Sequence, residues 1–389
     1  LEVYQSPDID GLPPLHGGLM GYLGYDVVRE VEHLPDTPPD DRGFPDGVMS
    51  VIGDMVAIDH WRQRAVLIAN VVIPENADEE TLDSLYAEAQ QRLDDLAAAG
   101  AKPLDEPLMA PPDPEEEPPE TTSSISRENY CLAVEAAREH ILAGDIFQVV
   151  LSQRFDVELG AEPFDVYRVL RQINPSPYMY FLRYPDMTVV GSSPEPMVQL
   201  LGGRVISRPI AGTRRRGASD VEDRRMAAEL VEDPKERAEH VMLMDLARND
   251  VGRVVRFGTE EVEEMMTLER YSHVMHLTSQ VSGELAPGHT PIDVLRATLP
   301  AGTVSGAPKV RAMEIIDQLE PVKRGPYAGV VGYFDFSGNI DTAIAIRTML
   351  VKDGIASVQA GAGIVADSIP EAEYEECRNK AKALLVAVP

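Results

Sequence analysis

The sequence predicts an α+β fold in which the β-sheets are largely antiparallel. Strand-like runs follow one another with tight turns between them, as at Gly202-Gly203 and Asp353-Gly354. Helical stretches fall between these hairpins and do not alternate regularly with single strands. Two-residue turns join antiparallel strands, whereas parallel strands need longer crossovers. We therefore expect hairpin-built sheets with helices beside them and not a doubly wound domain.

Residues 1–101 are expected to form an N-terminal portion on the regulatory or partner-facing side. A Gly-rich stretch at 17–25 precedes two strand-like runs, at 48–59 and 65–73, and a helix over 79–99. Leu1 is not a methionine, so we expect this portion to be truncated. Residues 102–126 are rich in Pro and Glu and cannot bury a core, which predicts a linker.

Residues 127–389 are expected to form the main folded unit. Its first helix ends at Gly144, and Asp233-Pro234 is typical of a helix start. The glycine pair at 202–203 predicts a hairpin. Helices are expected at 127–143, 234–249, 309–319 and from 370 onward, and strands at 146–158, 197–201, 204–210, 327–336, 340–351 and 355–363.

Composition limits the class of protein. The chain has 389 residues, of which 44% are hydrophobic and 26% charged, as in a globular protein of one large or two ordinary domains. No apolar stretch is long enough to span a membrane, and no signal-peptide pattern opens the chain. The only cysteines, Cys131 and Cys377, indicate a reducing cytoplasm.

The charge balance argues against two kinds of partner. With 35 basic and 65 acidic residues the net charge is −30, which disfavours nucleic acid and anionic membranes. An anionic substrate would need strong local positive charge to bind here.

The loop at 300–309 carries two glycines, Thr303, Ser305 and Lys309. Glycine allows close backbone approach, and a loop that opens a helix can present N–H groups to an anion. An ordinary helix entry fits these residues equally well.

Two helices each carry a pair of glutamates three residues apart, Glu236 with Glu239 and Glu373 with Glu376. This spacing places each pair on one helical face. If the two faces met, the site would be rich in carboxylate oxygen, which suits Mg²⁺. The alternative is two solvated acidic faces, with Glu376 and Lys380 as an ordinary i,i+4 ion pair.

The predicted strand 340–351 places Arg347 on the same face as Ala343 and Ala345. Small neighbours leave room for a ligand carboxylate beside the guanidinium. A solvent-facing arginine on an edge strand is the alternative. Tyr327 and the run 361–363 either line such a pocket or are closely packed backbone.

His276 and Glu195 are candidate proton-transfer groups. His276 is a possible base, although a lone histidine is more often structural, and Glu195 ends a predicted strand where a general acid could lie. The sequence has no Ser-His-Asp order, Walker loop, dinucleotide fingerprint or HExxH helix.

Together the motifs resemble those of the chorismate-utilising enzyme family. The resemblance is nearly continuous from Ser126 to the end of the chain. The matching runs are Gly144-Asp-Ile-Phe-Gln-Val-Val150, Asn174-Pro-Ser-Pro-Tyr-Met179, Gly191-Ser-Ser-Pro-Glu195, Arg208-Pro-Ile-Ala-Gly-Thr213, Asp233-Pro-Lys-Glu-Arg-Ala-Glu-His240, Asp245-Leu-Ala-Arg-Asn-Asp250, 300–309, Gln359-Ala-Gly-Ala-Gly363 and Glu376-Cys-Arg-Asn-Lys380.

The resemblance implies a chorismate-binding catalytic domain over 127–389, built of antiparallel sheets packed in a sandwich with flanking helices. The implied reaction converts chorismate and ammonia to anthranilate and pyruvate through aminodeoxyisochorismate, on the route to tryptophan. A glutamine amidotransferase subunit would supply the ammonia in a hetero-oligomer, and tryptophan would inhibit.

The same resemblance implies roles for individual residues. Glu239, Glu376, Glu236 and Glu373 would hold Mg²⁺. Glu195, His276 and Thr213 would be catalytic, with Glu195 protonating the departing 4-hydroxyl. The substrate would be bound by Gln148, Thr303, Tyr327, Arg347, Gly361, Gly363 and Lys380. Tryptophan would bind at Asn174, Pro175, Ser176, Pro177, Tyr178 and Met179, although the family's Leu-Leu-Glu-Ser segment for that site is not found in this sequence.

Two positions favour amination at C2 over the family's other reactions. Relatives that add water at C2 carry a lysine base where this chain has Gln148, and relatives that aminate at C4 carry a nucleophilic lysine where it has Ala211. The alternatives are an enzyme that releases aminodeoxyisochorismate and a non-catalytic scaffold that binds only a partner subunit.

Overall fold

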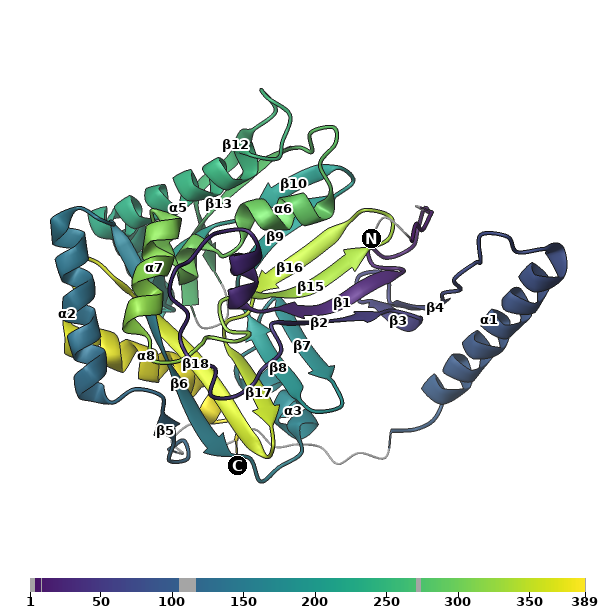
Figure 1. The fold of residues 1–389 in the computed structure, drawn as a ribbon, viewed down its shortest axis with the longest axis horizontal. Helices are drawn as coiled ribbons and strands as arrows, with labels where there is room; N and C mark the ends of the chain where they lie inside the picture. The colour runs from purple at the N-terminus through teal and green to yellow at the C-terminus, as the bar shows by residue number, and fades with distance from the viewer. Residues whose placement is uncertain (1–3, 8, 105–116, 271–273, 389) are drawn as a thin grey trace.

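The computed structural model describes residues 4–7, 9–104, 117–270 and 274–388. Two large sheets of nine and seven strands dominate it, and a third sheet has two strands (Figure 1). All strand pairs in these sheets are antiparallel, from the β1–β15 pair to the β7–β8 pair. The predicted α+β class with antiparallel sheets is therefore confirmed.

The larger sheet has the order β11-β13-β10-β9-β16-β15-β1-β2, with β12 beside β13. Its strands are β1 Gly18–Leu23, β2 Gly47–Val51, β9 Pro196–Leu201, β10 Arg204–Ser207, β11 Ile210–Arg215, β12 Glu261–Arg270, β13 Val274–Glu284, β15 Val330–Asp335 and β16 Ile340–Ile344. Residues of the N-terminal portion thus complete one edge of this sheet. The proposed boundary at 102–126 remains a prediction, and its centre, 105–116, lies outside the described residues.

The smaller sheet has the order β14-β6-β18-β17-β8-β7, with β5 beside β6. Its strands are β5 Thr122–Ser123, β6 Gln148–Glu158, β7 Tyr178–Arg183, β8 Thr188–Ser193, β14 Gly306–Ala307, β17 Thr348–Lys352 and β18 Ile355–Ile364. The two-stranded sheet pairs β3 Asp54–Asp59 with β4 Arg64–Ala69.

Helices lie beside the sheets, except for the first one, which stands apart from the two large sheets (Figure 1). They are α1 Glu79–Gly100, α2 Arg127–Ala143, α3 Pro163–Ile173, α4 Asp220–Glu232, α5 Pro234–Gly252, α6 Pro291–Thr298, α7 Lys309–Leu319 and α8 Pro370–Leu385, with the 3-10 helices η1 Tyr25–Glu30 and η2 Gly302–Val304. None of the described helices is both long and apolar enough to cross a membrane.

Local sequence explains several boundaries. The Asp233 side chain caps α5 by accepting from the N–H groups of Lys235 and Glu236, which would otherwise lack partners. At the C-terminal end of a helix, Gly144 ends α2 with φ 84°, a left-handed conformation that glycine adopts readily. Gly202 and Gly203 turn the β9–β10 hairpin with φ 55° and 80°, as a two-residue turn requires.

Two predicted strands are wrong in the same way. The run at 48–59 divides into β2 in the larger sheet and β3 in the two-stranded sheet, and the run at 340–351 divides into β16 and β17. In the second case the chain leaves the larger sheet and joins the smaller one, with Arg347 at φ 48° in the break. Arg347 therefore does not lie on a continuous strand face with Ala343 and Ala345.

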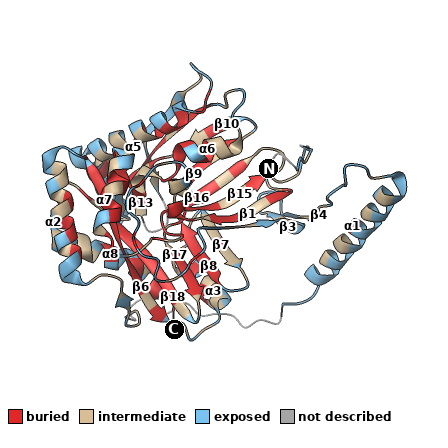
Figure 2. Cartoon of the chain, in the orientation of Figure 1, coloured by how far each residue is buried: buried red, intermediate tan, exposed pale blue. Residues whose placement is uncertain are grey.

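The core lies between the two large sheets and under the helices (Figure 2). Tyr22 and Val331 of the larger sheet pack with Val189 and Leu350 of the smaller one. Helix α1 differs: Ala89 is its one buried residue among those described, and Tyr86 is 66% exposed. The helix therefore packs over only a small part of its surface, and it stands away from the two large sheets (Figure 1).

Gly306 offers a test of the packing between the 300–309 loop and β6. A β-carbon there would lie 2.2 Å from the Gln148 carbonyl oxygen, and its φ of 143° is unsuitable for other residues. We expect Gly306→Ala to lower the free energy of unfolding by about 1–3 kcal/mol in denaturant titrations. Gly160→Ala, where the added carbon meets open space, should change it by less than about 0.5 kcal/mol. Equal effects of the two substitutions would contradict this packing.

Candidate active site

A cavity of about 1120 Å³ opens where the two large sheets meet α5 and α8. Residues from both sheets and both helices line it. The cavity brings together all fourteen residues predicted for catalysis, substrate and metal, namely Gln148, Glu195, Thr213, Glu236, Glu239, His276, Thr303, Tyr327, Arg347, Gly361, Gly363, Glu373, Glu376 and Lys380. Their placement agrees with one site, while their roles remain predictions.

Glu195 and Arg347 lie at two neighbouring strand crossovers. The chain passes from β8 to β9 at Glu195 and from β16 to β17 at Arg347, and each time it changes sheet. Backbone bonds hold the crossovers together, from Ile344 N to Glu195 O (3.0 Å) and from Ser192 N to Arg347 O (3.1 Å). Two residues far apart in the sequence are thereby fixed beside one cavity.

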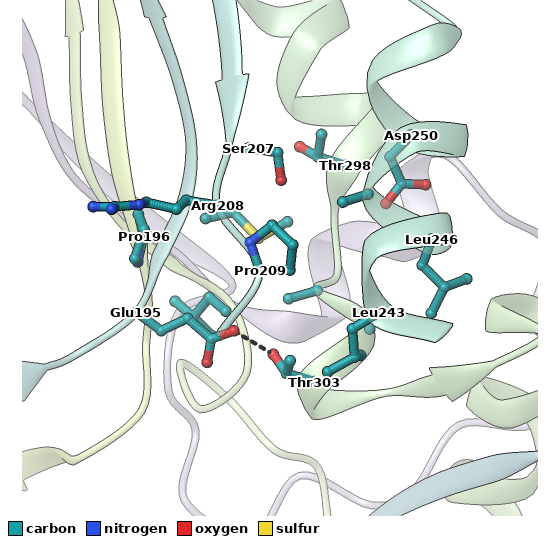
Figure 3. A pocket seen from close by; sticks show the side chains of 15 residues that line it. Glu195, Pro196, Ser207, Arg208, Pro209, Leu243, Leu246, Asp250, Thr298 and Thr303 are labelled. Carbon is teal, nitrogen blue, oxygen red and sulfur yellow. Dashed lines mark hydrogen bonds between the residues drawn. The ribbon is translucent and has the colours of Figure 1, made fainter. Parts of the chain in front are cut away.

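Burial raises the pKa of Glu195 to about 7, because the charged form loses its hydration. A hydrogen bond from Thr303 Oγ1 to Glu195 Oε1, 3.0 Å long, and the charges of Lys380 and Arg347 act in the opposite direction. Figure 3 shows this bond beside a smaller cavity of about 50 Å³. A carboxyl group with this pKa can donate a proton near neutral pH.

The Arg347 guanidinium makes no hydrogen bond or ion pair with any described residue. Burial lowers its pKa, although the Glu195 charge opposes that shift. Its backbone adopts φ 48°, a conformation that is strained for a residue with a side chain. A charged fork held in this way, without a partner among the described residues, is suited to bind a ligand carboxylate.

Four glutamates face the cavity from α5 and α8. Burial raises the pKa of Glu239, and the neighbouring charges of Glu236 and Glu376 raise it further. Burial likewise raises the pKa of Glu373, and Glu376 adds to that shift. The two acidic helix faces therefore act on each other electrostatically across one cavity, as the Mg²⁺ hypothesis required.

The glutamates do not form a ready-made metal cage. Within the described parts of the chain no three His, Cys, Asp or Glu side chains converge on a metal position. Arg214 binds Glu236 at 2.8 Å, and Lys380 binds Glu376 at 2.8 Å. Mg²⁺ commonly keeps several waters and uses one or two carboxylates plus substrate oxygens. The donors, which are all oxygen, therefore fit an ion that the substrate helps to hold.

Lys380, Tyr327 and Gln148 surround the glycines of β18. Lys380 Nζ donates to the Gly361 carbonyl at 2.9 Å. A β-carbon at Gly361 would lie 2.7 Å from the Tyr327 hydroxyl oxygen, and one at Gly363 would lie 2.6 Å from Gln148 Nε2. The glycines thus make room for these side chains. Gln148 Oε1 is buried and has no hydrogen-bond partner among the described residues.

Thr213 and His276 meet on the neighbouring strands β11 and β13. Thr213 Oγ1 lies 3.0 Å and the Gly212 carbonyl oxygen 3.2 Å from His276 Nδ1. Burial lowers the pKa of His276, and the charge of Arg347 adds to this effect. The imidazole is therefore mainly neutral at pH 7 and able to accept a proton.

Part of the predicted tryptophan segment also reaches the cavity. Residues 174–177 line it, whereas the Tyr178 hydroxyl donates to Asp341 at 3.0 Å and Met179 packs in the core of the smaller sheet. The last two side chains therefore turn away from the cavity.

Some contributors carry no clear signal in the sequence. Lys235 lines the cavity beside the glutamates, and Arg214 binds Glu236. By contrast, Lys309 of the 300–309 loop does not line this cavity, because it binds Asp250 at 2.7 Å. The i,i+4 spacing of Lys235 and Glu239 on one helical face could have indicated Lys235. No such pattern indicates Arg214, which lies on a strand.

Among the described residues, the cavity combines an acid with a pKa near 7, a guanidinium that pairs with none of them, and glutamate oxygens as possible metal ligands. These features define an enzyme site for a small anionic substrate. The chain belongs to the family described as chorismate binding enzyme, whose sequence profile matches residues 2–386. It is 49% identical over 389 residues to "Anthranilate synthase component 1" of Acetivibrio thermocellus, covering 99% of this chain and 78% of the relative. It is 50% identical over 387 residues to the protein of that name from Pseudomonas putida, covering 99% and 77%.

Solved structures agree with this membership. Anthranilate synthase component I from Streptococcus pneumoniae TIGR4 superposes with a TM-score of 0.88 at 41% identity, covering 99% of this chain and 84% of that one. MenF, the menaquinone-specific isochorismate synthase from Escherichia coli, superposes with a TM-score of 0.73 at 18% identity, covering 99% and 94%. The second likeness shows the shared fold alone.

Replacing Glu195 should stabilise the folded protein at high pH. The folded-state pKa of about 7 exceeds the ordinary 4.5, so this group lowers stability progressively as the pH rises from about 4.5 to 7. We expect Glu195→Gln to raise the free energy of unfolding by about 1–3 kcal/mol at pH 8 and by little at pH 4. Glu135→Gln, at an exposed position on α2, is the control. A pH-independent difference would contradict the raised pKa.

Proposed function

We propose that this chain is the aminating component of an anthranilate synthase. It would convert chorismate and ammonia to anthranilate, pyruvate and water through 2-amino-2-deoxyisochorismate. The observation that carries the proposal is that Glu195 and Arg347 line one cavity. The first would be the proton donor, and the guanidinium of the second has no partner among the described residues. The identity near 50% to relatives named anthranilate synthase component 1 supports the choice of reaction.

Substrate binding is assigned to two cationic residues of the cavity lining. Arg347 and Lys380 provide the positive charge that the net charge of −30 makes necessary. The Tyr327 hydroxyl and the Gly361–Gly363 backbone would orient the carboxylates, with Thr303 near the enolpyruvyl group. Because the Arg347 fork has no partner within the described parts of the chain, it can bind a carboxylate in bidentate fashion.

The four glutamates are assigned to Mg²⁺, with Glu239 and Glu376 as ligands and Glu236 and Glu373 binding directly or through water. When bound, the ion supplies positive charge that offsets the repulsion between these side chains and the ring carboxylate. Two like charges at 4 Å repel by about 4 kcal/mol at an effective dielectric of 20. Arg347 and Lys380 alone would not offset several such repulsions.

Proton transfer is assigned to two residues. Glu195 donates its proton to the 4-hydroxyl, the C4–O bond breaks as ammonia adds at C2, and water leaves. The added nitrogen then loses a proton, which restores Glu195. His276, held by Thr213 and neutral at pH 7, assists the later loss of pyruvate.

Two lining positions favour ammonia over other nucleophiles. Gln148 and Ala211 both border the cavity, and neither has an amine. Gln148 cannot deprotonate water, whereas ammonia is already a nucleophile. Ala211 cannot form a covalent adduct at C4. These positions therefore support amination at C2.

The ammonia is assigned to a glutamine amidotransferase subunit in a hetero-oligomer. Two free cysteines among the described residues fit the cytoplasm as its location. We further propose tryptophan as an inhibitor that binds at the 174–177 side of the cavity. A rate unchanged by millimolar tryptophan would contradict this assignment.

Anthranilate fluorescence tests the reaction. We expect signal on mixing the protein with chorismate, Mg²⁺ and ammonium, no turnover in excess chelator, and a loss in Glu239→Gln beyond the roughly 10–100-fold typical of residues around a metal site. Glu229→Gln, exposed on α4, should behave like the parent. Isochorismate or 4-amino-4-deoxychorismate as the main product would contradict the proposal. An aminated ring without anthranilate would indicate release of the intermediate.

Removal of the guanidinium should weaken chorismate binding selectively. We expect Arg347→Ala to raise KM for chorismate about 10- to 150-fold, because a hydrogen bond to a charged group contributes about 1.5–3 kcal/mol. The KM of Arg347→Lys should lie between those of the parent and Arg347→Ala, since lysine keeps the charge but lacks the planar fork. Both substituted residues have a β-carbon, as arginine does, so the backbone strain at φ 48° is the same in the parent and in the two variants. An unchanged KM in steady-state kinetics would exclude carboxylate binding by Arg347.

A further inference from the structure

Arg324 is a buried arginine that none of the assignments above uses. It follows α7, is 3% exposed, and lies outside the residues that line the large cavity. Its guanidinium donates to the carboxylate of Glu320 through Nε at 2.8 Å and Nη2 at 2.6 Å. Although burial acts against its charge, Glu320 keeps the pKa of Arg324 above the ordinary value.

Its remaining contacts go to segments that carry site residues. Nη1 donates to the Val304 carbonyl at 2.7 Å, directly after Thr303, and Nη2 donates to the Val150 carbonyl at 2.7 Å, two residues after Gln148. The guanidinium carbon also lies 5.6 Å from the centre of the Tyr327 ring. One side chain therefore contacts the backbone or ring of three segments that line the cavity.

Glu320 extends this network to a fourth segment. It accepts from Ser152 N at 2.7 Å and from Ser152 Oγ at 2.9 Å. Ser152 Oγ in turn accepts from Gln359 Nε2 at 2.8 Å, two residues before Gly361. On the opposite side Arg324 lies 4.7 Å from the centre of the Tyr25 ring in η1. The pair is therefore enclosed by the N-terminal portion and by the walls of the cavity.

We propose that Arg324 is a positioning residue, which never touches the substrate but holds Thr303 and Tyr327 where Glu195 and the substrate carboxylate need them. The inference rests on the function proposed above. Arginine is required because its planar fork serves one carboxylate and two carbonyl groups at once. A lysine ammonium is a compact charge on a flexible stem and cannot reach all of these acceptors together.

Arg324→Lys is the first test, with kcat measured across pH at constant free ammonia. We expect kcat to fall about 100-fold, because small displacements of catalytic groups have effects of this size. The limb of the pH profile on which Glu195 loses its proton should move to higher pH, since the Thr303 hydrogen bond that lowers its pKa would be weakened. Arg29→Lys is the matched control, a half-buried arginine that binds Asp26 and Asp317 away from the cavity.

A double-mutant cycle with Thr303→Val separates positioning from general damage. If Arg324 acts through Thr303, the shift of the pH limb in the double variant should equal that of Thr303→Val alone. Additive shifts, or a parent-like kcat and pH limb in folded Arg324→Lys, would overturn the proposal. Absence of anthranilate formation by the parent would instead contradict the proposed function.

The neutral pair Glu320→Gln with Arg324→Met covers the case in which Arg324→Lys does not fold. Replacing both charges avoids leaving one of them buried and unpaired, which is the main destabilising effect of single changes. The amide oxygen introduced by Glu320→Gln can still accept from Ser152 N. We expect this variant to fold by circular dichroism and to show the same loss of kcat and the same shift of the pH limb. Parent-like kinetics in the folded double variant would overturn the proposal.

Discussion

The site depends on a pair of neighbouring strand crossovers between the two large sheets. β8 and β17 pair in the smaller sheet, β9 and β16 pair in the larger one, and the connections run side by side. The Ile344 carbonyl accepts from Ser193 Oγ at 2.7 Å, which fastens one crossover to the other. Because backbone bonding fixes both connections, Glu195 and Arg347 are held next to each other without a direct ion pair.

Among the residues that the structure describes, none pairs with the Arg347 guanidinium, and this gives the cavity its chemical character. Burial of Glu195 keeps a proton on it near neutral pH, while Arg347 keeps its charge free for a ligand. In the same cavity α5 and α8 present carboxylates that repel one another. A dianionic substrate would supply the missing partner for the Arg347 charge, and a divalent cation would offset the repulsion among the glutamates. Either ligand alone would leave one of these charges uncompensated.

Local patterns in the sequence were enough to predict elements whose ends depend on their own residues, such as α7 and the turn of the β9–β10 hairpin. The predicted strand 204–210 is too long, since β10 ends at Ser207 and Ile210 begins β11. The division of 340–351 was not predictable, because the run is uniformly suited to a strand and the change of sheet is imposed by β9 and β8, distant in sequence. The family resemblance identified the residues around the cavity. It did not identify Arg324, because its role depends on contacts with Val150, Val304 and Tyr25, which lie on segments that only the tertiary fold brings together.

The most direct test is the titration of Glu195 itself, followed by carboxyl ¹³C NMR of glutamate-labelled protein and assigned by comparison with Glu195→Gln. If the crossover buries this carboxyl group as described, its pKa in the free protein lies near 7. Its proton would then be available for transfer to the substrate. A pKa near the ordinary 4.5 would mean that Glu195 is already ionised at neutral pH. It would then be unable to act as the proton donor at the centre of this account.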